Sequence, residues 1–455
     1  MSSASTLFRG GTLVDPQGLL QADLLVEDGR VSAVGLDLQH PQAEEVDATG
    51  LLILPGLIDA HTHIALDTGI YQSPEDWHSG STCAAYGGVT TVIDFATPDP
   101  AHSLHHALAE RIAQAAPSLV DYAFHMMIPP PWQPRLTEIA AAAAGGITSI
   151  KLYTTYRPNY FLDDHAILAL MGAAAALGLP TLVHCENDAL VSAATEALLA
   201  QNQRHWAFHP QARPAAAEIE AAHRVLTLAD CAQAPVVIAH NSCAQTVRLV
   251  AAARAAGQTA YCESTPQYLH LDASLYAGDA PWRYILQPPL RAVEEVQGLR
   301  RLLEEGHIDM ISTDHCGYSR EQKRAHADFS RTPGGLPGLE TLFPMSAALM
   351  AHLPTFTWSD LVRCLAANPA KIYGLWPRKG NLRPGADADL ILVEAGATTI
   401  RDESLHGQAG YSPFDGHRGE GRITAVMRRG DFILWEDKIV APSHSGIFIP
   451  ANHRR

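Results

Sequence analysis

The chain has 455 residues, of which 47% are hydrophobic and 18% are charged. This composition can bury a large core and is not that of a disordered protein. Lys and Arg number 32 against 48 Asp and Glu, so the net charge is −16, which argues against an electrostatic hold on nucleic acid or on anionic lipid. No apolar run approaches the ~20 residues of a membrane span.

Residues 1–22 show no basic start followed by an apolar stretch, so we expect no cleaved secretion signal. The seven cysteines are odd in number and contain no close Cys-x-x-Cys pair. This argues against a disulfide framework or a zinc finger, and it makes a reducing cytoplasm the expected location.

Both ends of the chain have the pattern of short β-strands. Apolar runs alternate with turn residues at Leu7-Phe8, Leu24–Val26, Val31–Val34, Asp389–Val393, Ile423–Met427 and Phe432–Leu434. Such runs predict hairpins. We expect one small β-sandwich domain built from residues 1–52 and 379–440, followed by a C-terminal tail of residues 441–455.

Residues 53–378 alternate apolar strands with Ala-rich helical stretches. We expect eight strands, near Leu57–Ala60, Thr91–Phe95, Tyr122–Met127, Ser149–Tyr153, Thr181–His184, Val236–His240, Thr259–Cys262 and Asp309–Ser312. Helices are expected between them, for example at Ala101–Ala116, Asp164–Leu177, Ala215–Ala232 and Ala244–Ala256. Repeated strand and helix units predict a parallel sheet, and eight of them favour a closed (β/α)8 (TIM) barrel, an α/β fold.

Polar residues follow these strands at their carboxyl ends, where barrel enzymes place their active sites. His61 and His63 are two residues apart on an extended chain, so both rings point to one side and can hold one metal ion. His184 and His240 end neighbouring strands and can hold a second ion, while Asp314 offers an oxygen ligand or a base.

Lys151 lies in the fourth barrel strand, where a bare ammonium would be costly to bury. A salt bridge or a side chain reaching solvent would explain it. The chemical alternative is a deprotonated amine that has reacted with CO2, because the resulting carbamate can bind two metal ions with its two oxygens.

At this point the sequence resembles the amidohydrolase superfamily. The resemblance rests on GLIDAHTHI (56–64), TSIKLYTTY (148–156), TLVHCEN (181–187), VIAHNS (237–242) and STDHC (312–316). A second set looks like the cyclic amidase branch of hydantoinases and dihydropyrimidinases: ESTPQYL (263–269), PPLR (288–291), GGLPGLE (334–340), NPAKIYGL (368–375) and GADADLILVE (385–394).

The resemblance implies two divalent metal ions, usually zinc in this branch. His61, His63 and Asp314 would bind one ion and His184 and His240 the other. Lys151, as N6-carboxylysine, would bridge them together with a hydroxide. The pair of ions would lower the pKa of the bridging water. The hydroxide would attack the ring carbonyl, and Asp314 would carry its proton to the leaving nitrogen.

Two tyrosines compete for the role of oxyanion donor in this scheme. Tyr156 stands where the hydantoinase pattern has a tyrosine that hydrogen-bonds the developing oxyanion, and we favour it. Tyr153 has a spacing from Lys151 that would also fit this role, or it packs in the wall of the barrel.

Two departures from the hydantoinase pattern fall at expected substrate-binding positions. Gln287 precedes the Pro288-Pro289 pair where the pattern usually has serine, and Gly334 replaces a usual asparagine. Because such positions bind the amide edge of the ring partly through main chain, the changes either alter the preferred ring or are neutral.

The sequence thus predicts a metal-dependent hydrolase that opens a hydantoin-like or dihydropyrimidine-like ring to an N-carbamoyl amino acid. Allantoinase, dihydroorotase or another cyclic imide or lactam hydrolase are the enzymatic alternatives. A non-catalytic scaffold of the same branch would lack the metal ligands, and a mononuclear deaminase would not need Lys151. Family habit predicts a homotetramer in which the tail from Pro442 onward reaches a neighbour.

Overall fold

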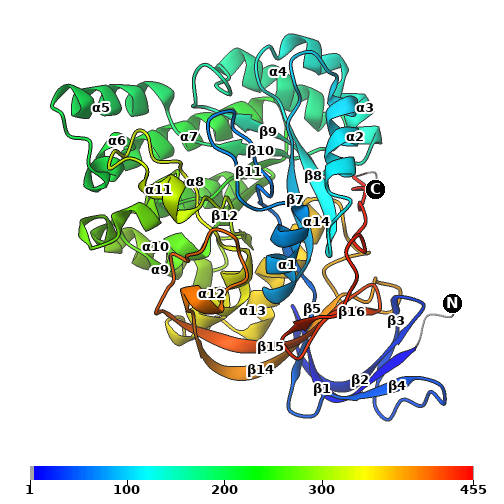
Figure 1. Cartoon of the computed structure of the whole chain (residues 1–455). Helices are drawn as coiled ribbons and strands as arrows, with labels where there is room; N and C mark the ends of the chain where they lie inside the picture. Colours follow the sequence, from blue (N-terminus) through cyan, green and yellow to red (C-terminus); the bar gives the residue numbers. More distant parts are fainter. Residues whose placement is uncertain (1–4, 454–455) are drawn as a thin grey trace.

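Nine strands from the two ends of the chain form one mixed sheet, which lies below the barrel in Figure 1. The computed structural model describes residues 5–453, so the first four and last two residues of the expected sandwich and tail lie outside it. The strands are β1 (Thr6–Asp15), β2 (Gly18–Glu27), β3 (Arg30–Gly35), β4 (Glu44–Asp47), β5 (Leu52–Pro55), β14 (Leu390–Thr399), β15 (Arg418–Arg428), β16 (Asp431–Trp435) and β17 (Lys438–Ile439).

The two halves of this sheet meet where β5 pairs with β14 in antiparallel register. The strand order is β17-β16-β15-β14-β5-β1-β2-β3, with β4 beside β1. Apolar side chains from both ends of the chain, such as Phe8, Leu24, Leu390 and Met427, share one core. The prediction of a sheet assembled from both termini is therefore confirmed.

The barrel consists of eight parallel strands paired in chain order. These are β6 (Leu57–Asp59), β7 (Val89–Ala96), β8 (Asp121–Met127), β9 (Ser149–Tyr153), β10 (Thr181–His184), β11 (Val236–Ile238), β12 (Ala260–Ser264) and β13 (Met310–Ile311). The ring closes just beyond β6 and β13, where the N–H of His63 donates to the carbonyl of His315 at 2.7 Å. The predicted eight-stranded barrel is confirmed.

Two barrel strands are shorter than the sequence suggests. Strand β11 ends at Ile238, and His240 adopts a φ of 33°. Strand β13 contains only Met310 and Ile311, and Asp314 adopts a φ of 50°. A positive φ does not belong to a strand, so these two site residues lie on turns just past the strand ends.

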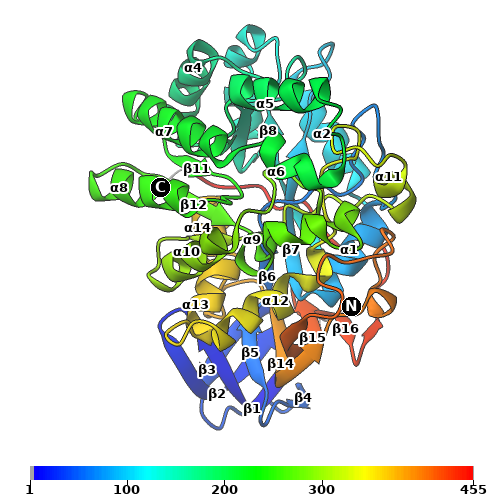
Figure 2. The ribbon, with the colours of Figure 1, turned by 90° about the vertical axis from the view of Figure 1, so that its left-hand side faces the viewer.

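Helices surround the barrel, as Figures 1 and 2 show from two directions. They are α1 (Trp77–Tyr86), α2 (Leu104–Gln114), α3 (Ile139–Ala144), α4 (Asp164–Ala175), α5 (Asp188–Ala200), α6 (His209–Ala212), α7 (Ala215–Cys231), α8 (Ala244–Ala255), α9 (Pro266–His270), α10 (Val293–Glu304), α11 (Arg320–Arg324), α12 (Leu342–Ala348), α13 (Trp358–Val362) and α14 (Asn368–Ile372). The four helices expected above are present with ends shifted by up to three residues. None of the helices within residues 5–453 is long and apolar enough to cross a membrane.

The C-terminal tail binds its own barrel at the end opposite the site. The N–H of Tyr122 donates to Ile447 and the N–H of Ile449 donates back to Tyr122, at 3.0 and 2.8 Å. Phe448 stacks on Phe124 with ring centres 6.0 Å apart. Tyr122 stands at the start of β8, so the described tail covers the amino-terminal end of the barrel. These hydrogen bonds join the tail to its own chain, and the expectation that it also reaches a neighbour stays a prediction.

Candidate active site

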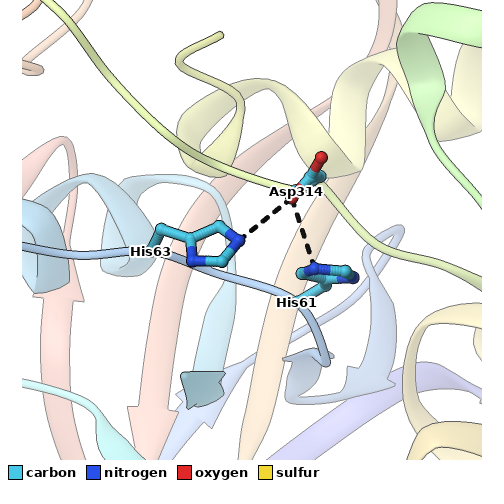
Figure 3. Close-up of side chains that lie close together, drawn as sticks. All are labelled: His61, His63 and Asp314. Carbon is cyan, nitrogen blue, oxygen red and sulfur yellow. Dashed lines mark ion pairs between the residues drawn. The ribbon is translucent and has the colours of Figure 1, made fainter. Parts of the chain in front are cut away.

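Three of the predicted ligands lie together at the carboxyl end of the barrel. His61 and His63 follow β6, and Asp314 follows β13 (Figure 3). The Nε2 atoms of both histidines lie 3.3 Å from the same Oδ1 of Asp314. One ligand atom from each residue fits within 4.8 Å of the others. Two imidazole nitrogens and a carboxylate oxygen arranged in this way suit a divalent ion such as zinc.

His184 and His240 form a second pair beside this group. Nδ1 of His184 lies 2.9 Å from Nε2 of His240, and the ring of His240 is centred 5.5 Å from that of His61. Burial lowers the pKa of both histidines below the usual value. They are therefore neutral at pH 7, which is the state that binds metal.

The amine of Lys151 lies at this cluster and is buried. Its Nζ is 3.4 Å from Nε2 of His61 and lies over the rings of Phe95 and Tyr153, at 5.3 and 5.2 Å from their centres. Burial lowers the pKa of the Lys151 amine to about 8. With this pKa, roughly a tenth of the amine is unprotonated at pH 7, and only that form reacts with CO2.

Two buried glutamates orient these histidines, and sequence reasoning did not identify them. Nδ1 of His61 donates to Glu263 at 2.7 Å, and Nε2 of His184 donates to Glu186 at 2.7 Å. Each glutamate thereby fixes which ring nitrogen remains free, the usual role of a carboxylate behind a metal-binding histidine. Both glutamates lie in quoted motifs, since Glu263 begins ESTPQYL and Glu186 follows His184 by two residues. The sequence did contain a signal for both glutamates, because each is a carboxylate at the end of an otherwise apolar strand.

Arg213 connects one of these glutamates to the tyrosine expected in catalysis. It stands between α6 and α7, and its guanidinium donates to Glu186 and lies 5.3 Å from the ring centre of Tyr156. Burial alone would raise the pKa of Glu186, but Arg213 and His184 outweigh it and hold that pKa below the usual range. Glu186 is therefore an anion. Arg213 belongs to none of the quoted motifs, so no sequence pattern pointed to it.

Both candidate tyrosines lie near His184. The ring of Tyr156 is centred 4.9 Å from that of His184, and the ring of Tyr153 is centred 5.7 Å away. Tyr156 adopts a φ of 73°, a conformation that is strained for an aromatic residue and that is found mainly where a functional site requires it. Burial raises the pKa of the Tyr156 hydroxyl, which therefore keeps its proton and can donate a hydrogen bond.

The two expected substrate-binding positions lie outside the ligand cluster and against each other. A Cβ added to Gly334 would stand 2.9 Å from Cδ of Gln287. Residues just after Gly334 run beside the segment that carries Asp314, because Leu336 pairs with His315. The structure thus brings all nine predicted site residues to the carboxyl end of the barrel or to the loops beside it.

A buried cluster of histidines and a carboxylate at the mouth of a (β/α)8 barrel defines a class of metal-dependent hydrolase. The model of the amidohydrolase family matches residues 52–433. The chain therefore belongs to this family.

Individual relatives show which members of the family this chain resembles. The chain is 35% identical to D-phenylhydantoinase of Escherichia coli over 97% of each chain, and 33% identical to D-hydantoinase of Streptomyces coelicolor over 98% of each. The crystal structure of dihydropyrimidinase from Brevibacillus agri matches with a TM-score of 0.96 at 31% identity over 99% of each chain. An L-hydantoinase (dihydropyrimidinase) from Arthrobacter aurescens matches with a TM-score of 0.91 at 29% identity, over 99% of this chain and 100% of that one. The expected resemblance to hydantoinases and dihydropyrimidinases is confirmed.

Proposed function

We propose that this protein hydrolyses a cyclic amide bond in a hydantoin-type or dihydropyrimidine-type ring and releases an N-carbamoyl amino acid. One observation carries the proposal: four histidines, an aspartate and a buried lysine meet at the barrel mouth of a chain that belongs to the amidohydrolase family. The type of ring is inferred from the names of the relatives described above.

The donor set fits two ions. His61, His63 and Asp314 would hold one of them, and His184 and His240 the other. Among the described residues no carboxylate forms a direct ion pair with Lys151, whose side chain is 1% exposed, and Glu263 and Asp314 favour its charged form only from a greater distance. A buried ammonium without a direct ion pair is costly, whereas N6-carboxylysine would be an anion able to bridge two cations. Zinc is the metal we propose, because imidazole and carboxylate suit it.

The bound ions would supply water activation and polarisation of the ring carbonyl. The chain's own residues would perform the remaining steps. Asp314, whose pKa is lowered by His61 and His63 against the effect of burial, is ionised and can accept a proton and deliver it to the leaving ring nitrogen. The hydroxyl of Tyr156 would donate a hydrogen bond to the carbonyl oxygen as negative charge develops on it. Gln287 and Gly334 would lie along the edge of the ring.

A substrate panel and a metal analysis test the proposal together. We expect ring opening of hydantoin or dihydrouracil and about two zinc ions per chain. Faster turnover of allantoin, dihydroorotate or succinimide would move the assignment to that ring. A metal-free protein that opens none of them would support a scaffold, and one ion with full activity in the Lys151→Ala variant would support a mononuclear enzyme.

We also propose that the protein is a cytoplasmic homotetramer. All seven cysteines are free, and six of them are buried, which is compatible with a reducing compartment. The tetramer rests on the family resemblance alone. Light scattering coupled to size-exclusion chromatography of the purified protein tests it, and a monomeric mass would contradict it.

A further inference from the structure

The guanidinium of Arg213 contacts two groups of the candidate active site at once. Its Nε donates to both carboxylate oxygens of Glu186, at 3.0 and 3.1 Å, and a second nitrogen donates to the same carboxylate. Glu186 in turn accepts the hydrogen bond from Nε2 of His184 at 2.7 Å. The guanidinium also lies over the ring of Tyr156, 5.3 Å from the ring centre. Arg213 therefore joins a proposed metal ligand to the proposed oxyanion donor.

The ion pair of Arg213 and Glu186 is buried. The side chain of Arg213 is 9% exposed and that of Glu186 is 0% exposed. A buried ion pair contributes little to stability in comparison with apolar residues of the same volume, because both charges must leave water. Its place directly behind His184 indicates a role in the site rather than in stability alone.

The backbone that carries Arg213 is fixed by a second buried network. Nη1 of Arg291 donates to the carbonyl of Arg213 at 2.6 Å, and Nε of Arg291 donates to the hydroxyl of Ser242 at 2.9 Å. Glu218, on α7, accepts from the N–H of Ser242 at 3.1 Å. Because Ser242 follows His240 by two residues, these bonds join Arg213 to the segment that carries the other histidine of the second pair.

Tyr156 needs support of this kind because its backbone is strained. Its φ of 73° persists only where the surrounding structure imposes it. The hydroxyl of Thr154 donates to the carbonyl of Glu186 at 2.8 Å and accepts from the N–H of Glu186 at 2.9 Å, which ties the two segments together. Among residues 5–453, Arg213 lies over no aromatic ring other than that of Tyr156. This contact distinguishes Tyr156 from Tyr153.

We propose that Arg213 is a positioning residue that couples the second histidine pair to the oxyanion donor. This inference rests on the proposed function. Through Glu186, the guanidinium fixes the ring of His184 so that Nδ1 faces His240. Over Tyr156, the same guanidinium holds the phenol ring by cation–π attraction. One planar cation thus sets the position of a metal ligand relative to that of the donor.

The Arg213→Lys variant tests the coupling, because lysine retains the charge that Glu186 requires but lacks the planar fork. We expect kcat for the ring that the wild-type protein opens to fall roughly tenfold to a hundredfold, the cost of a misplacement of about 1 Å, with little change in KM. In the Tyr156→Phe background the same change should cost several times less, because the donor is already absent. In the Tyr153→Phe background the loss should be full. Arg248→Lys, an exposed change on α8, is the matched control.

Metal binding provides a readout that does not depend on turnover. Competition with a chromogenic chelator should show that one of the two zinc ions is bound about tenfold more weakly in Arg213→Lys, the effect of losing support behind a metal-binding histidine. The other ion should be unaffected. If Arg213→Lys does not fold, the double variant Arg213→Met/Glu186→Gln takes its place, because it removes both buried charges and leaves neither unpaired.

Either of two results would overturn the inference: equal losses of kcat in the wild-type and Tyr156→Phe backgrounds, or unchanged affinity for both ions. Both results would leave the proposed function intact. A wild-type protein that binds two zinc ions but opens neither hydantoin nor dihydrouracil would overturn the proposed function, and this inference with it.

Discussion

Glu263 connects the two halves of the metal-ligand cluster: it accepts a hydrogen bond from Nδ1 of His61 at 2.7 Å, and its Oε1 also accepts the backbone N–H of His240 at 3.0 Å. Its other oxygen accepts from Ser312 at 3.3 Å. One buried carboxylate thus ties together the ends of four barrel strands and orients a ligand of each proposed ion.

Replacing Glu263 with Gln should therefore weaken metal binding. The variant keeps the shape but exchanges one oxygen that accepts a hydrogen bond for an NH2 group, which cannot accept from His61 or Ser312, and loss of such a partner costs about 10- to 100-fold in metal affinity. Competition with a chromogenic chelator measures this. Glu294→Gln, an exposed change on α10, is the matched control. Equal affinities in the two variants would contradict the orienting role.

The Lys151→Ala variant should lose both bound metal and turnover. It removes the amine whose carbamate would bridge the ions. Elemental analysis and the ring-opening assay measure the two losses. In the wild-type protein, native mass spectrometry should show one added CO2 per chain. Active, fully metallated protein with an unmodified lysine would refute the bridging scheme.

Tyr156→Phe should lower kcat by about 10² to 10³, the cost of one oxyanion donor, with a small change in KM. Tyr153→Phe is the matched control, because it removes a hydroxyl from a ring that lies at a similar distance from His184. Steady-state kinetics on both variants separate the two tyrosines. A larger loss of kcat in the Tyr153 variant would transfer the role to that residue.

The stability of the protein should depend on pH through Lys323. Burial lowers the pKa of this amine from 10.5 to about 7, so between these values the unfolded chain binds a proton that the folded protein does not. The free energy of unfolding should therefore rise with pH in this window by up to ~1.4 kcal/mol per unit, relative to Lys323→Met. Urea unfolding of both proteins at pH 7, 8 and 9 measures the difference. Parallel profiles would mean that Lys323 stays protonated in the folded protein, because its Nζ donates to the carbonyls of Ile285, Pro333 and Gly335.

The sequence was sufficient to predict the barrel and the residues that gather at its mouth, because both depend on local patterns. His61, Lys151 and His184 each end or lie within an apolar run, and parallel strands bring their carboxyl ends together. We did not predict the roles of Glu263 and Arg213, because their partners lie far away in the chain. Glu263 and His61, for example, are 202 residues apart.

Contacts between loops were equally inaccessible from the sequence. Gln287 and Gly334 each stood out as a departure, but only the fold places one against the other. The tail shows the same limit: the apolar residues Ile447 to Ile449 indicate that this segment is covered, and the sequence does not say whether its own barrel or another covers it.

The pairing of β5 with β14 also sets an order of events during synthesis. Strands β1 to β5 leave the ribosome first and present an unpaired edge until β14 has been translated. At about 5–20 residues per second, that interval lasts tens of seconds. An open edge invites pairing with other chains, so nascent protein is at greatest risk of aggregation in this period. Slow translation of the barrel would therefore reduce the yield of active enzyme without changing any residue of it.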